Sequence, residues 1–88
     1  MKKKNLKDKI ISPTGLALAA AYKQLSLMDV IKLAKILKIP INEVKYELYV
    51  LERQGNIMIK DGRLVIPATA HRLTHVTAQN AAQYLFDT

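Results

Sequence analysis

The chain has 88 residues, of which 50% are hydrophobic and 24% are charged, and it contains no cysteine. This length predicts one small domain with a single hydrophobic core, and the composition excludes a disordered chain. The lack of cysteine excludes a disulfide framework, a cysteine-bound zinc and a thiol nucleophile, and it is typical of a protein from a reducing cytoplasm.

The formal net charge of +7 is unevenly distributed. Residues 1–9 contain five lysines and one aspartate, a net charge of +4, and residues 23–63 contain eight basic and five acidic side chains, a net charge of +3. Residues 64–88 contain one basic and one acidic side chain and are neutral. Because basic surfaces attract phosphate, the charge favours a nucleic-acid partner. A tail that only aids solubility is the alternative.

Residues 1–10 are interpreted as a flexible basic arm, in which Lys2, Lys3 and Lys4 are candidates for contacting phosphates. The lysines followed by "LALAAA" resemble a secretory signal, but residues 12–15 (SPTG) interrupt the apolar stretch. We therefore expect a cytoplasmic protein. No apolar run reaches the ~18 residues of a membrane span, so no membrane partner is expected.

Two helices are predicted after the arm. Ser12 is a good N-cap and Pro13 suits a first turn, which predicts a helix over residues 13–23. Ser26 opens a variant of the capping box, which predicts a second helix over residues 27–37.

A third helix is predicted to begin at Pro40 or Ile41, because proline fits a first turn, and to end at Gly55. About three residues then join the second and third helices. The apolar stripe of this helix consists of Ile41, Val44, Leu48 and Leu51.

Hydrogen-bond donors and aromatic rings lie opposite that stripe. At about 100° per residue, Lys45 falls on one flank and the carboxylates of Glu43 and Glu47 fall on the other. Asparagine, lysine and arginine can read base edges in a major groove, and tyrosine more often contacts phosphate or sugar. The alternative is that the tyrosines only pack and that the asparagine only finishes a turn. The side chains opposite the stripe are Asn42, Tyr46, Tyr49, Val50 and Arg53.

A β-hairpin is predicted next. Two β-prone runs, residues 57–60 and 63–66, flank Asp61-Gly62, which is typical of a two-residue type I′ turn. The hairpin places Lys60 and Arg63 near its tip, where they could reach DNA or simply remain solvated. Further phosphate contacts are expected from Lys32, Lys35 and Lys38.

The order helix, helix, short turn, helix and hairpin is similar to that of winged helix-turn-helix domains. The resemblance is carried by "LAKILKIPINEVKYELYVLERQGNIMIKDGRLVI" and covers roughly residues 13–67. It implies a mainly α fold with a small β-hairpin: a three-helix core, a wing and a C-terminal helix, with the domain at 11–67. It also implies sequence-specific binding of double-stranded DNA by a small transcriptional regulator, through helix 41–54 and hairpin 57–66. Because this fold also occurs in protein-binding adaptors, a protein partner is the alternative.

The third helix is also similar to that of Z-alpha domains, which bind left-handed DNA and RNA. Lys45 stands where that family has asparagine, and the chain lacks the tryptophan that the family carries in its wing. Left-handed nucleic acid is therefore a minor alternative. The shared positions are Pro40, Glu43-Val44, Leu48-Tyr49-x-Leu51 and Gly55.

Residues 68–88 are predicted to form a helical extension, with Thr77 as a cap. Its apolar face could pack on the first helix or pair two chains, and we expect a homodimer because two half-sites usually bind a dimer. The residues assigned to this dimer interface are Ala78, Ala81, Ala82, Leu85 and Phe86.

No enzyme, metal site or cofactor is expected. His71 and His75 have a spacing that can hold zinc on a helix, but neither cysteine nor an acidic cluster supplies further ligands. The sequence has no glycine-rich phosphate loop and no serine with an evident base, so catalysis is not predicted.

Overall fold

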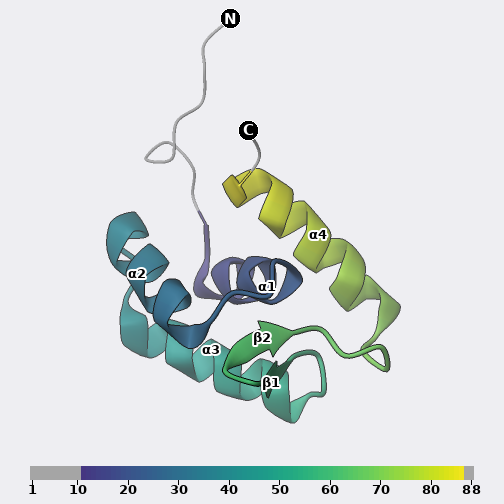
Figure 1. The fold of residues 1–88 in the computed structure, drawn as a ribbon. Coiled ribbons are helices and arrows are strands. Elements are labelled where there is room, and N and C mark those ends of the chain that lie inside the picture. Colours follow the sequence, from purple (N-terminus) through teal and green to yellow (C-terminus); the bar gives the residue numbers. More distant parts are fainter. Residues whose placement is uncertain (1–10, 87–88) are drawn as a thin grey trace, which may run out of the picture.

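The computed structural model describes residues 11–86, which form four helices and one two-stranded hairpin (Figure 1). The prediction of a mainly α fold with a small β-hairpin is confirmed. In chain order the elements are α1 (Pro13–Tyr22), α2 (Leu27–Leu37), α3 (Ile41–Arg53), β1 (Met58–Lys60), β2 (Arg63–Val65) and α4 (Arg72–Phe86).

α1 is the centre of the hydrophobic core. It begins as predicted, with the Ser12 Oγ accepting a hydrogen bond from the Gly15 N–H at 3.0 Å. Every residue from Leu16 to Ala21 is buried. A helix that is apolar on all sides must be covered on all sides. α2, α3, β2 and α4 all contact it (Figure 1).

α4 packs against α1 within the single chain. Ala78, Ala82 and Leu85 are buried within the single chain, and Ala81 and Phe86 pack on the same core. Small alanine side chains on both helices permit a close approach. The five residues assigned to a dimer interface thus pack on the core of their own chain, which was the alternative that the sequence left open. The pairing of two chains stays a prediction.

α4 also begins earlier than expected, at Arg72, six residues before the start that a cap at Thr77 would give. The His71 Nδ1 accepts a hydrogen bond from the Leu73 N–H at 3.1 Å, and the Thr74 hydroxyl donates to the Asn56 Oδ1 at 2.9 Å. The second bond joins α4 to the segment after α3. Because this contact is long-range, helix propensity alone did not predict the earlier start.

The second and third helices follow the sequence closely. The Ser26 Oγ accepts a hydrogen bond from the Asp29 N–H at 3.1 Å at the start of α2. α2 ends at Leu37, and its C-cap Lys38 has a left-handed φ of 60° that turns the chain. Residues 38–40 link α2 to α3, which is the expected three residues. The predicted apolar stripe of α3 supplies the buried residues Val44, Leu48 and Leu51.

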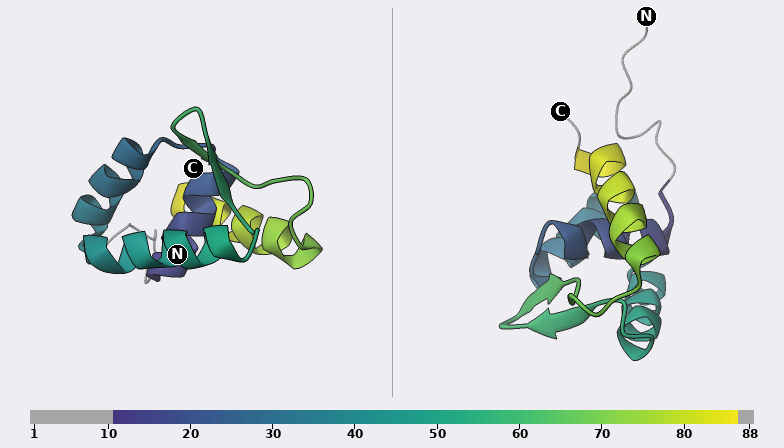
Figure 2. Two further views of the ribbon diagram at one scale, coloured as in Figure 1. Left: turned by 90° about the horizontal axis from the view of Figure 1, so that it is seen from below. Right: turned by 90° about the vertical axis from the view of Figure 1, so that its right-hand side faces the viewer.

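The hairpin is fixed to the rest of the fold through the α1–α2 turn. Its register pairs Ile59 with Leu64. Asp61 and Gly62 have φ values of 53° and 78°, which fits the predicted type I′ turn. The Leu64 N–H donates to the Leu25 carbonyl at 2.9 Å, and the Leu64 side chain is fully buried. This anchor holds the hairpin on the same side of α3 as α2 (Figure 2, left).

Candidate nucleic-acid interface

The outer surface of α3 exposes five of the six side chains that the sequence assigns to it and its flank, and the sixth, Val50, is half-buried. Because the apolar stripe turns inward, the opposite face is left to solvent. Tyr46 and Tyr49 are 66% and 55% exposed, which is unusually high for tyrosine. We call the exposed residues opposite the stripe, together with Lys45 on their flank, the α3 strip: Asn42, Lys45, Tyr46, Tyr49 and Arg53.

Two members of the α3 strip hold each other in place. The Arg53 Nη1 donates a hydrogen bond to the Tyr49 hydroxyl at 3.2 Å, and the guanidinium carbon lies 5.7 Å from the centre of the tyrosine ring. This cation–π contact orients the arginine one helical turn from its partner. An ordered guanidinium loses less side-chain entropy when it binds a base edge or a phosphate.

Carboxylates border one edge of the strip. Asn42 and Tyr46 line a shallow hollow of about 340 Å³ together with Glu43, Glu47 and the first residues of α1. This edge repels phosphate. A nucleic acid lying on the α3 strip would therefore place its phosphates toward the opposite edge.

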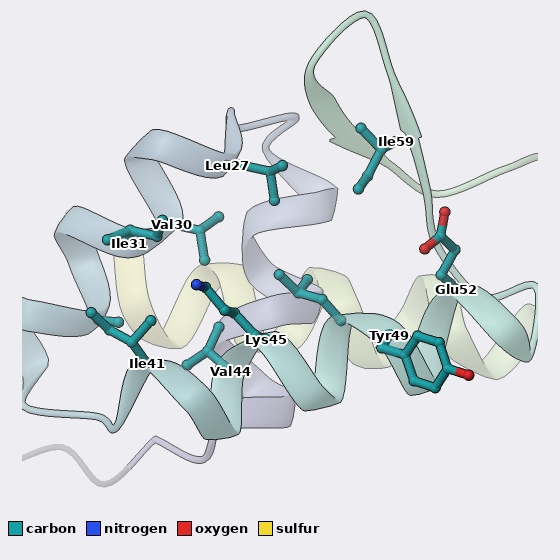
Figure 3. A pocket seen from close by; sticks show the side chains of 11 residues that line it. Leu27, Val30, Ile31, Ile41, Val44, Lys45, Tyr49, Glu52 and Ile59 are labelled. Carbon is teal, nitrogen blue, oxygen red and sulfur yellow. The ribbon is translucent and has the colours of Figure 1, made fainter.

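Lys45 lies on that opposite edge, beside α2. Its side chain runs toward Val30 of α2, and its nitrogen stands over an apolar pocket (Figure 3). Among residues 11–86, the ammonium has no hydrogen-bond or ion-pair partner. Lys45 is thus exposed and free to pair with an anion, but its side chain points toward α2 rather than straight outward from α3.

The remaining predicted phosphate contacts are distributed over α2 and the hairpin. Lys32, Lys35, Lys38 and Lys60 are all exposed. Arg63 is also exposed, but its Nη1 donates to the Gln24 carbonyl at 3.0 Å. That hydrogen bond joins Arg63 to the α1–α2 turn. Arg63 therefore helps to hold the hairpin on the fold and does not extend freely from its tip.

Three predicted contacts, Lys2, Lys3 and Lys4, lie outside the described residues. Within residues 11–86, no three histidine, cysteine or acidic side chains are grouped so as to hold a metal ion. The same part of the chain contains no helix whose length and apolar character would let it cross a membrane.

Sequence reasoning missed an apolar groove between α2, α3 and the hairpin. The groove has a volume of about 320 Å³. The signal was present in α2, where Leu27 and Ile31 widen the apolar face beyond the width that one neighbouring helix covers. Its apolar lining consists of Leu27, Val30, Ile31, Ala34, Ile41, Val44, Leu48 and Ile59, with Lys45, Tyr49 and Glu52 beside them (Figure 3).

Comparisons with protein-family models, with curated proteins and with solved structures give no match to this chain. The resemblance to winged helix-turn-helix domains therefore depends on the residues and the fold described above, and it stays a prediction.

Proposed function

We propose that the chain is a winged helix-turn-helix protein that binds double-stranded DNA and regulates transcription. In this proposal α3 is the recognition helix and the β1–β2 hairpin is the wing. The order of the elements and the three-residue link between α2 and α3 support the proposal. So does the net charge of +7.

The single observation that carries the proposal is the composition of the α3 strip. A helix fits a major groove that is about 12 Å wide, and asparagine, lysine and arginine can pair with base edges there. A face that needed only to be soluble would not require two tyrosines at 66% and 55% exposure beside an oriented arginine. Tyr46 and Tyr49 are suited to sugar and phosphate contacts.

Charge also suggests how the duplex would lie. The carboxylates of Glu43 and Glu47 border the α1 edge of the strip, whereas Lys45 lies on the other edge, beside α2. Phosphates would lie on the second edge near Lys45, because farther toward the hairpin that edge carries Glu52, which repels them.

An electrophoretic titration against mixed-sequence duplex DNA, repeated at low and moderate salt, tests this function. Binding that weakens steeply with salt is expected, because each neutralised phosphate contributes about 0.9 to the slope of log K against log salt. An alternating GC duplex held in the left-handed form, run in parallel, tests the minor alternative. Selection from random duplexes would then give the preferred sequence.

A protein-binding adaptor is the second candidate, and the outer face of α2 favours it. Met28 and Ile36 are 63% and 66% exposed there, beside the exposed Lys32 and Lys35. Exposed apolar side chains of this size often mark protein contacts. No DNA binding at low salt would support the adaptor over the regulator.

A further inference from the structure

The groove between α2 and α3 has the size and lining of a small-molecule site. Its volume of about 320 Å³ falls at the lower end of the roughly 300–1,000 Å³ that is typical of ligand pockets. Val30 and Ile31 come from α2, Val44 and Leu48 from α3, and Ile59 from β1 (Figure 3). Walls from three elements make a concave site rather than a flat patch.

Lys45 gives this groove a charged end. Its side chain runs along the groove wall and directs its ammonium toward α2, where residues 11–86 offer it no anion (Figure 3). A lysine often lays its carbon chain on an apolar surface while its charge stays accessible. A ligand with a hydrocarbon body and one anionic group would match both the apolar lining and the ammonium. Its anionic group would form a charge-assisted hydrogen bond with Lys45, which is stronger than a neutral one.

Glu52 restricts which anion fits. It lines the groove near the hairpin, seven residues after Lys45, which corresponds to about 10 Å along a helix. A second carboxylate at that end of a ligand would meet Glu52 and be repelled. The charges at the two ends therefore favour a single anionic group, placed at Lys45.

We propose that the groove binds a small apolar monocarboxylate. The carboxylate pairs with the Lys45 ammonium, and the hydrocarbon chain extends toward Leu27, Leu48 and Ile59. This site goes beyond the proposed DNA binding and does not depend on it.

One consequence does rest on the proposed function. Lys45 belongs to both the α3 strip and the groove, so a carboxylate bound there removes a cation from the DNA surface. By linkage, the ligand weakens DNA binding by the same factor by which DNA weakens ligand binding.

Titration of the ¹⁵N-labelled protein with octanoate, without DNA, tests the site directly. Amide shifts of α2, of α3 near Lys45 and of β1 should change and saturate, whereas α4 should be unaffected. Octanedioate, which brings a second carboxylate to Glu52, and octanol, which lacks the anionic group, have the same chain length and should each bind at least about tenfold more weakly. Absence of saturable shifts with octanoate, or equal affinity for the three compounds, would overturn the proposal.

Three variants locate the two ends of the ligand. Lys45→Gln should weaken octanoate about tenfold but leave octanol binding unchanged. Ile59→Gln places an amide in the groove and should weaken both compounds. Ile36→Gln is the matched control, because this exposed isoleucine does not line the groove. Equal loss in Ile36→Gln and Ile59→Gln, or no loss in Lys45→Gln, would contradict the assignment.

A DNA titration with and without octanoate separates the two proposals. Weaker DNA binding in octanoate, abolished in Lys45→Gln, supports the coupling. Saturable octanoate shifts in a protein that binds no DNA would leave the groove assignment standing and overturn the proposed function.

Discussion

α1 and α4 meet through small buried side chains, whereas α2 and α3 leave a groove of about 320 Å³ between them. Both pairs are helices around one core. On the first pair, alanines allow the helices to approach until no solvent-accessible apolar face remains between them. On the second pair, larger side chains such as Ile31 and Ile41 remain half-buried. Stability is therefore concentrated at α1–α4, and exposed chemistry is concentrated at α2–α3.

The largest effect is expected at the centre of the first pair. Leu16 is fully buried, so Leu16→Ala should lower the free energy of unfolding by about 2–5 kcal/mol, because apolar burial decreases and a cavity remains. Urea denaturation measures the change. Leu73→Ala, at a site on α4 that is 65% exposed, is the control and should change stability by less than about 0.5 kcal/mol. Similar losses of unfolding free energy in both variants would contradict the claim that stability is concentrated in the buried α1–α4 contact.

Leu85→Ser distinguishes a core role for α4 from a dimer interface. Leu85 is 6% exposed within one chain, so the substitution should cost about 2–5 kcal/mol of folding stability. Urea denaturation and light scattering of the same samples give the answer. A variant that keeps the stability of the parent but changes from dimer to monomer would support the dimer interface instead of the core role.

A smaller effect is expected where α3 ends. Gly55 has a φ of 77°, and a Cβ added there would have no neighbouring heavy atom within 4 Å. The cost of Gly55→Ala is therefore backbone strain alone, about 1–2 kcal/mol. Thermal unfolding measures it. Gly55→Asn, which tolerates the left-handed region better, should lose less. If the two variants lose the same amount, strain is not the cause.

Deletion of residues 1–9 should lower the affinity for DNA and reduce its salt dependence. Five lysines are removed, and each phosphate that the arm no longer neutralises lowers the slope by about 0.9. Titrations at several salt concentrations supply both slopes. Identical slopes for the full chain and the truncated chain would confine phosphate binding to the folded part.

Local signals were sufficient to predict most of the fold. Ser12 and Ser26 cap their helices as expected, and Asp61-Gly62 forms the turn whose φ values its residue types favour. The predictions failed where segments that are distant in the sequence pack together. The early start of α4 depends in part on Thr74 reaching Asn56, eighteen residues away. The apolar face containing Ala78 and Ala82 was predicted, but its packing on α1 was only one of two options, because periodicity identifies an apolar face but not what covers it.

The candidate site likewise combines features that the sequence predicts with features that depend on packing between distant segments. Exposure of Asn42, Tyr46 and Tyr49 follows from helical periodicity, and the sequence was sufficient to predict it. The anchoring of Arg63 to Gln24 and the turning of Lys45 toward α2 depend on how separate elements pack, which no local pattern encodes.

The central claim is that the α3 strip contacts DNA. The most direct measurement compares the affinities of Arg53→Ala and Arg72→Ala for a panel of duplexes at one salt concentration. Both arginines are exposed and both substitutions remove one charge, but Arg72 lies at the start of α4. Arg53→Ala should lose about 1–3 kcal/mol, unevenly across sequences, if it reads a base, whereas Arg72→Ala should lose little. Equal and sequence-independent losses in the two variants, or no loss in Arg53→Ala, would contradict the claim.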